Sequence, residues 1–341
     1  MRLTHWLAGL ARKQPLSRRF TRRKWHGDLR PAVERLEKLF SSFGLRERIV
    51  EVGQESIEEF SGDATYDLVI AEGFVNTLEH RDQMLSKMCR LTAPGGLAVV
   101  SFDECVGYTL ELVRKLIFWR AYRLEGLNDV RSAESLALAE RIFSEDFSQL
   151  NASRAFVGWY DDVLVNPFVA SDYLWSYQEM LPLIEQEGCE FHATSPTWAS
   201  VDRFAWYKNV LDSKDRHQKI LTEWPEAFSF FLTGLPGDLG QTSPPTEEVV
   251  DSVTDLNNRV SNYFLDPDGD VSSVFYPGAL DDYLSQSADP RVRLFNEEWK
   301  GVHLAASSNA AADVIEAYQS TNSLRRTWGM PYHYLSIRNL K

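Results

Sequence analysis

The first third of the chain alternates between two patterns of apolar residues. Short, continuous apolar runs predict strands of the kind that a parallel sheet buries on both faces. Between these runs, apolar residues at helical spacing predict amphipathic helices. The strands are expected at 49–52, 66–71 and 97–102, and the helices at 31–43 and 77–91. Strands that alternate with helices at this spacing indicate βαβ units, so we expect an α/β fold.

The pattern changes after Phe102, where helical spacing becomes dominant. An aromatic-rich loop interrupts it at 156–168, and a pair of short strands near the middle of the chain is suited to close a sheet. Helices are expected at 108–124, 132–147 and 173–187, and the two closing strands at 189–194 and 202–208. At the start of the chain, the apolar spacing within 3–11 favours a helix over a strand.

These patterns divide the chain into four parts. Residues 1–105 carry the expected parallel sheet and 106–178 form a helical insertion suited to cover a substrate. Residues 179–210 hold the closing strands, and 211–341 form a mainly helical C-terminal region.

Composition limits the class of protein. Of 341 residues, 44% are hydrophobic and 25% are charged, which fits a folded globular chain and argues against disorder or a coiled coil. No apolar run is long enough to predict a membrane-spanning helix. The three cysteines are too few and too scattered for a disulfide framework or a zinc site. We therefore expect no metal and a reducing, cytoplasmic location.

The charge of the chain is unevenly distributed. The net charge is −13, but the first 30 residues hold nine Lys and Arg side chains against one acid, so they carry +8 and the remainder carries −21. A basic arm of this kind suits a solvated surface, a targeting segment or an RNA contact. Because no recognised RNA-binding module adjoins it, we favour the solvated surface and do not expect a nucleic-acid partner.

Four stretches of the chain resemble a class I S-adenosylmethionine-dependent methyltransferase. The family's fourth strand opens with an aromatic residue, an aspartate and a hydrophobic run, and its fifth strand follows a Pro-Gly-Gly turn; both occur here in that order. The four stretches are Gly27–Glu34, Arg48–Phe60, Tyr66–Gly73 and Arg90–Val100. The pair of closing strands is similar to the family's final antiparallel hairpin. The resemblance covers about half the chain and implies a Rossmann-like sheet with a helical insertion.

The resemblance also implies a binding site for S-adenosyl-L-methionine. Asp28 stands where the family places the acid that accepts the ribose hydroxyls. Glu55, Ser56 and Ile57 occupy the loop that faces the adenine. The loop from Glu72 to Asn76, with Glu72 and Gly73 as its candidate binding residues, faces the methionine and its methyl group. Simpler roles compete with these: Asp28 can cap the helix that begins at Pro31, and Glu55 and Ser56 can cap the short turn Ile57–Phe60.

Candidates for substrate binding and catalysis follow. Trp159, Tyr160 and Trp175 offer an aromatic wall for a small acceptor, although they equally suit the core of a helical insertion. Asp161 or Asp162 can orient or deprotonate the acceptor, and His80, which follows the fourth strand of the family, is the reserve base. A single histidine at a helix start is more often only solvated.

The glycine-rich loop that the family carries after its first strand is not found upstream of Asp28. Three explanations remain open: the chain is a fragment, residues 3–10 are the first strand with Gly9 as the remnant of the loop, or the protein is a degenerate relative without cofactor binding. We favour the first, which predicts an open reading frame upstream of Met1 encoding roughly 30 or more residues with a Gly-x-Gly-like loop.

The sequence therefore predicts methyl transfer from S-adenosylmethionine to an oxygen or nitrogen atom of a small molecule or glycan. The alternative is a non-catalytic, methyltransferase-like subunit that binds a partner, or a second copy of itself, through its C-terminal helices.

Overall fold

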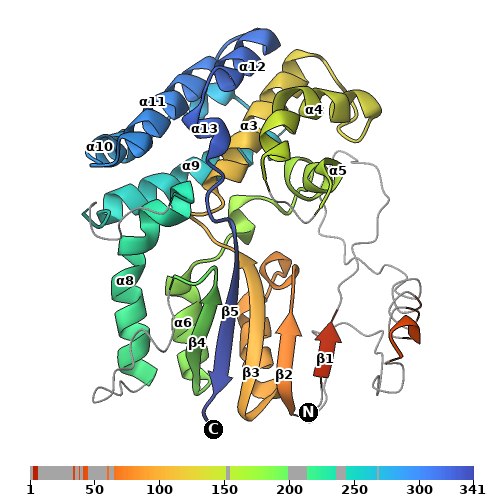
Figure 1. Cartoon of the computed structure of the whole chain (residues 1–341), viewed down its shortest axis with the longest axis vertical. Coiled ribbons are helices and arrows are strands. Elements are labelled where there is room, and N and C mark those ends of the chain that lie inside the picture. Colours follow the sequence, from red (N-terminus) through yellow and green to blue (C-terminus); the bar gives the residue numbers. More distant parts are fainter. Residues whose placement is uncertain are drawn as a thin grey trace.

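The computed structural model describes residues 3–6, 34, 38, 41–44, 60, 65–150, 154–198, 213–235, 243–266 and 269–341. These residues form a mixed α/β structure with two parts, a sheet half and a helical half (Figure 1). The strands of the sheet half are β1 (Leu3–Trp6), β2 (Tyr66–Ala71), β3 (Thr92–Asp103), β4 (Cys189–Ser195) and β5 (Tyr332–Asn339). Its helices are α2 (Arg81–Leu91), α6 (Tyr177–Gln186) and α8 (Ser213–Thr233).

The helical half lies beyond one end of the strands (Figure 1). It contains α3 (Thr109–Leu124), α4 (Ala133–Ser148), α5 (Phe156–Trp159), α9 (Glu247–Leu265), α10 (Gly278–Ser285), α11 (Pro290–Ala305), α12 (Ala311–Gln319) and α13 (Ser323–Arg326). Four single turns complete the described elements: η2 (Val75–Thr77), the π-helical η3 (Tyr160–Leu164), η4 (Ser171–Tyr173) and η5 (Val271–Ser273).

The strand order of the sheet is β1-β2-β3-β5-β4. Strands β1, β2 and β3 are parallel, and β5 is antiparallel to both of its neighbours. The prediction of a helix at 3–11 is wrong for Leu3–Trp6, because these residues pair with Leu68–Ala71 of β2. Pairing gives the outer edge of β2 hydrogen-bond partners, and this tertiary gain outweighs a weak local preference in so short a segment.

The C-terminal strand β5 was not predicted. It lies between β3 and β4, and it is the hydrogen-bonding partner of β4. The expected partner at 202–208 lies outside the described residues, as do the expected strand at 49–52 and most of the expected helix at 31–43. The C-terminal region is mainly helical as predicted, but it ends in a strand that the sheet requires.

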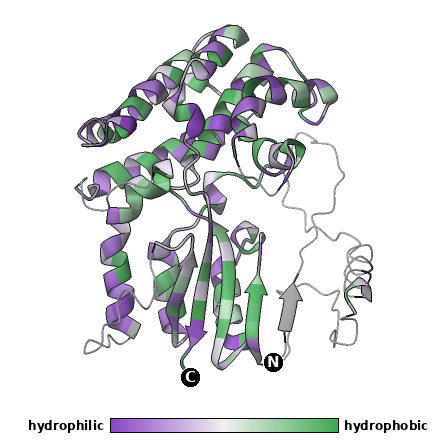
Figure 2. Ribbon diagram, viewed as in Figure 1, coloured by the Kyte–Doolittle hydropathy of each residue, from purple (hydrophilic) through white to green (hydrophobic). Residues whose placement is uncertain are grey.

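One face of the sheet is deeply buried. Alternate residues of β3 and β5, such as Val100, Phe102 and Leu335, have almost no exposed surface, because α2 and α6 pack against this side. The opposite face carries Ile70 and Val99, which remain partly exposed in the part of the chain that is described. The apolar character of the strands is visible in the hydropathy colouring (Figure 2).

Two close backbone contacts join the halves. Gly107 lies in the turn from β3 to α3, and a Cβ atom there would be 1.9 Å from the carbonyl oxygen of Met330. Gly329, which has a φ of 70°, would place a Cβ atom 2.5 Å from the carbonyl oxygen of Gly107. Only glycine fits this approach without displacing the backbone, so the start of α3 and the entry to β5 are held together.

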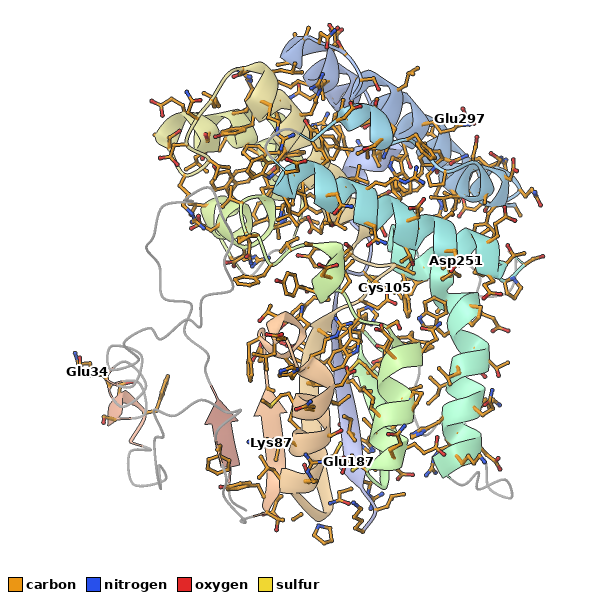
Figure 3. All side chains as sticks on the ribbon, turned by 180° about the vertical axis from the view of Figure 1, so that it is seen from behind. Glu34, Lys87, Cys105, Glu187, Asp251 and Glu297 are labelled. Atoms are coloured by element: carbon orange, nitrogen blue, oxygen red, sulfur yellow. The ribbon has the colours of Figure 1, made fainter. Side chains whose placement is uncertain are left out.

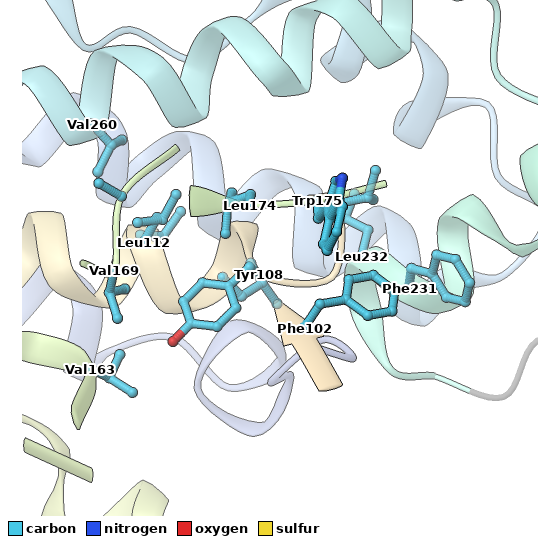
Figure 4. Close-up of a cluster of buried hydrophobic side chains, with 14 of the residues drawn as sticks. Phe102, Tyr108, Leu112, Val163, Val169, Leu174, Trp175, Phe231, Leu232 and Val260 are labelled. Atoms are coloured by element: carbon cyan, nitrogen blue, oxygen red, sulfur yellow. The ribbon is translucent and has the colours of Figure 1, made fainter. Parts of the chain in front are cut away.

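The core is continuous across the boundary between the halves. Figure 4 shows one cluster of buried side chains that includes Phe102 and Phe231 from the sheet half and Tyr108, Leu112 and Val260 from the helical half. Other labelled members of this cluster are Val163, Val169, Leu174, Trp175 and Leu232. Continuous burial of apolar surface across the boundary supplies the main attraction between the halves.

A buried lysine fixes the segment that follows η3. Lys115 of α3 donates hydrogen bonds to the carbonyl oxygens of Asn166 at 2.6 Å and Val169 at 2.8 Å. Its ammonium nitrogen also lies 3.7 Å from the ring centre of Phe264 in α9. Burial lowers the pKa of Lys115 well below its usual value, because no water solvates the charged form.

Truncating a buried side chain of β5 tests the role of this strand. We expect Leu335→Ala, at a position with 0% exposure, to lower the free energy of unfolding by about 2–5 kcal/mol. The exposed Arg338→Ala on the same strand is the matched control and should change it by less than about 0.5 kcal/mol. Urea titrations measure both values, and equal losses in the two variants would contradict a central position for β5.

Candidate functional site

A cluster of polar residues lies where β2 and β3 end and β5 begins. In open α/β sheets, ligands bind beyond the carboxyl ends of parallel strands, so this edge is the first place to look for a site. We call it the polar cluster; its members are Glu72, Gly73, Asn76, Ser101, Asp103, Tyr332 and Tyr334.

The buried hydroxyl of Ser101 is the centre of the polar cluster. It accepts a hydrogen bond from the backbone N–H of Gly73 at 2.7 Å and another from the hydroxyl of Tyr332 at 2.6 Å. Gly73 has a φ of 76°, a left-handed conformation that suits glycine and turns the chain sharply after β2. The hydroxyl of Tyr334 donates to the exposed carboxylate of Glu72 at 2.5 Å.

Asp103, the last residue of β3, is the group in the polar cluster best suited to proton transfer. One of its oxygens accepts a hydrogen bond from the amide of Asn76 at 3.0 Å, and the same amide donates to the carbonyl of Tyr173 at 3.2 Å. The second carboxylate oxygen has no hydrogen-bond partner among the described residues, and the side chain is partly exposed. Asn76 therefore fixes the carboxyl group while leaving one oxygen available.

Burial is the main cause that raises the pKa of Asp103 to about 7. The amide of Asn76 opposes this shift, the nearby Glu111 reinforces it, and Arg154 opposes it. Both protonation states are therefore populated near neutral pH, which is the condition under which a carboxyl group serves as a general base or acid.

The neighbouring carboxyl group has a different role. Glu104 is fully buried and accepts the backbone N–H groups of Val106 at 2.9 Å and Gly107 at 2.7 Å. Burial raises its pKa to about 7, and these two N–H groups oppose the rise. Because the side chain does not reach the surface, Glu104 stabilises the turn from β3 to α3 and does not face a ligand.

Two of the residues predicted for cofactor binding, Glu72 and Gly73, lie in the polar cluster. The other predicted residues of that group fall outside the described part of the chain: Asp28, Glu55, Ser56 and Ile57. His80, the predicted reserve base, is an exposed residue that immediately precedes α2.

The predicted aromatic wall lies in the core. Trp159 is 2% exposed, Tyr160 3% and Trp175 0%. The indole N–H of Trp159 donates to the carboxylate of Glu111 at 3.1 Å, and the hydroxyl of Tyr160 donates to the carbonyl of Val130. The expectation of an open wall is therefore corrected: the three rings are buried in the core, and the polar atoms of Trp159 and Tyr160 are hydrogen-bonded internally, although the indole N–H of Trp175 has no such partner among the described residues.

The two predicted acids beside this wall form ion pairs. Asp161 lies 3.5 Å from Arg131, and Asp162 lies 2.6 Å from Arg154. Since Arg154 also lowers the pKa of Asp103, the second pair is within electrostatic reach of the polar cluster.

Asn76 lies at the end of the loop predicted to face the methionine, but four other members of the polar cluster were not predicted. Ser101 and Asp103 had a usable signal, because they lie at the carboxyl end of a strand that the pattern does predict. Asn76 follows the preceding strand in the same way. No signal in the sequence marked Tyr332 and Tyr334, because their position depends on the pairing of β5 with a strand more than two hundred residues earlier.

Other kinds of site find little support within the described ranges. No group of three or more His, Cys, Asp or Glu side chains is arranged to hold a metal ion there. None of the helices in those ranges is long and apolar enough to cross a membrane. An open depression at the end of α9 is lined in part by Asn262, Asp266 and Asp270, and it does not hold a group of three such metal-binding side chains among the described residues.

Comparison with family models, with curated proteins and with solved structures finds no match to this chain.

The protonation of Asp103 can be measured directly. In protein labelled with ¹³C at the aspartate carboxyl carbons, we expect one resonance to titrate near pH 7 and to disappear in Asp103→Asn. In Asn76→Ala the midpoint should move higher, because the amide that favours the charged form is lost. A carboxyl resonance of Asp103 that titrates near the ordinary pKa of about 3.9 would contradict this description of the site.

Proposed function

We propose that the chain is a class I methyltransferase that transfers the methyl group of S-adenosylmethionine to an oxygen or nitrogen atom of a small molecule or glycan. The observation that carries the proposal is the arrangement of strands. The resemblance puts the family's first strand next to its fourth, and here β1 lies next to β2 in parallel. It also implies a final antiparallel hairpin at 189–194 and 202–208; β4 is the first of these strands, and its antiparallel partner among the described residues is the C-terminal β5.

The residues after β2 suit the methionine end of the cofactor. Glu72 presents an exposed carboxylate, which is complementary to a cationic amino group, and Tyr334 orients it. Gly73 has no side chain to obstruct the approach of a ligand to the backbone. In this proposal Asp28 holds the ribose, and Glu55, Ser56 and Ile57 face the adenine. When bound, the cofactor supplies an electrophilic methyl group.

Asp103 is the residue that we propose as general base. Its free carboxylate oxygen accepts the proton that the acceptor's hydroxyl or amine loses on methylation, and Asn76 holds the carboxyl group in place. Asp161 and Asp162 are less suited to this role because each is paired with an arginine. His80 stays a secondary candidate, since it is exposed at the same edge of the sheet, after β2. Alignment of the reacting atoms supplies the rest of the catalysis.

One observation favours the non-catalytic alternative. Because Trp159, Tyr160 and Trp175 are core residues, these three rings do not offer a wall for a small acceptor. A partner-binding protein with the same fold would use the outer surface of the helical half instead. A cytoplasmic location belongs to both forms of the proposal.

Calorimetric titration with S-adenosylmethionine separates the two. Because Leu3–Trp6 form a strand next to β2, the proposal takes the second explanation of the missing loop, in which residues 3–10 supply the first strand. We therefore expect the full chain to bind with a Kd of about 10 μM or tighter. Asp28→Ala should weaken binding at least about tenfold, because the ribose loses its acceptor. Glu316→Ala, an exposed acid on α12, is the matched control and should leave the Kd unchanged. If the folded chain does not bind S-adenosylmethionine, the enzyme proposal fails and the non-catalytic one replaces it.

A further inference from the structure

Two of the three cysteines meet in the sheet half. Cys89 lies near the end of α2, and Cys189 is the first residue of β4. The thiol of Cys89 forms a hydrogen bond with the sulfur of Cys189, and each residue is 2% exposed. These two residues, which we call the thiol pair, are reduced in the structure.

Contacts on both sides fix the backbone around the thiol pair. Arg90, next to Cys89, forms an ion pair of 2.6 Å with Glu187, two residues before Cys189. On the other side, Asn339 lies opposite Cys189 in the register of β4 and β5, and its amide donates to the carbonyl of Thr92 at 2.6 Å. The end of α2 and the start of β4 are therefore tied together at two points that enclose the two sulfur atoms.

The environments of the two sulfur atoms differ. The hydrogen bond from Cys89 lowers the pKa of Cys189, and the nearby Lys341 lowers it further, whereas burial and Glu187 oppose this. The same hydrogen bond, burial and the negative charge of Cys189 raise the pKa of Cys89. Cys189, whose thiol also donates weakly to the carbonyl of Glu187 at 4.0 Å, is therefore the more readily ionised of the two thiols, and Cys89 is the less readily ionised.

Access to the thiol pair requires only a local motion. Among the strands of the described residues, β4 is at the edge of the sheet and has a hydrogen-bonded neighbour, β5, on one side only. Edge strands open with less free energy than the complete unfolding of a protein requires. A small oxidant can therefore reach Cys189 while the remainder of the sheet stays folded.

We propose that Cys89 and Cys189 form a modification site, at which a small-molecule disulfide oxidises the two thiols to one intramolecular disulfide. The thiolate of Cys189 attacks one sulfur of the small disulfide and forms a mixed disulfide, and the displaced thiolate takes up a proton. Cys89 then loses its proton and attacks the sulfur of Cys189, which displaces the second small thiol. Two protein thiols are oxidised and one small disulfide is reduced to two thiols.

Cys105 provides an internal control. It lies at the boundary between the two halves, whereas Glu187, beside the thiol pair, lies next to the sheet (Figure 3). The sulfur of Cys105 contacts the carboxylate of Glu104 at 3.6 Å. Burial and the charge of Glu104 together raise the pKa of the Cys105 thiol well above its usual value. Cys105 therefore has no cysteine among its described contacts and a thiol that resists ionisation.

The test uses the native full chain and oxidised glutathione as the probe. After the reaction is stopped by alkylation, mass spectrometry should show loss of two hydrogen atoms and a cross-link between the peptides of Cys89 and Cys189. Reduction by dithiothreitol should reverse both changes. Cys105→Ser should behave like the parent chain, whereas Cys89→Ser should stop at a mixed disulfide between Cys189 and glutathione.

Circular dichroism of each variant establishes that it is folded before the oxidation is compared. The proposal is overturned if Cys89 and Cys189 of the folded parent stay reduced at glutathione ratios that oxidise the urea-unfolded chain, or if the cross-link includes Cys105. Neither result depends on S-adenosylmethionine binding, so this experiment tests the thiol pair independently of the proposed methyltransferase activity.

Discussion

The antiparallel pairing of β5 with β3 on one side and β4 on the other is the constraint on which the rest of the structure depends. The residues of β5 pair with Leu97–Asp103 of β3 and with Cys189–Ser195 of β4. Without β5, two rows of backbone donors and acceptors would lose their partners, at about 1–3 kcal/mol for each group that stays buried. The same strand brings Tyr332 and Tyr334 to the polar cluster, so the sheet and the candidate site are completed together.

The properties of the candidate site come from both halves of the molecule. The sheet half supplies Asp103 and the amide of Asn76 that holds it. The segment that returns from the insertion supplies the carbonyl of Tyr173, which accepts the second hydrogen bond of that amide. Glu111 in α3 and Arg154 near α5 act on the pKa of Asp103 in opposite directions. The acidity of this carboxyl group is therefore sensitive to the packing of the helical half on the sheet.

Local sequence patterns correctly predicted those helices and strands whose secondary structure does not depend on contacts with distant segments of the chain. The apolar run 66–71 is β2, and the predicted helices at 108–124 and 132–147 correspond to α3 and α4 with small shifts at their ends. Strand β5 was missed although its residues alternate between buried and exposed, because the helices before it dominate the region. The strand at Leu3–Trp6 agrees with an open explanation of the missing loop, in which residues 3–10 are a strand, but a helix was favoured because four residues carry too little pattern to decide between the two.

The candidate site was predicted in part for a similar reason. Glu72 and Gly73 follow a strong local strand signal, and they lie where such residues are expected. Trp159, Tyr160 and Trp175 show the limit of composition, because large rings serve a buried core and a ligand pocket equally well. Only the packing of α3, α4 and the π-helical turn distinguishes the two, and that information is not present in any one segment.

The order of elements along the chain has a consequence for how the molecule unfolds. The chain passes from sheet half to helical half after β3, returns before α6, leaves again after α8 and returns in β5. Neither half is a continuous segment, so no single cut can release either one as a separate domain. Because the chain crosses repeatedly between the halves, the segments of each half are covalently continuous with segments of the other. We therefore expect the stabilities of the halves to be coupled, so that the described part of the protein melts as one cooperative unit.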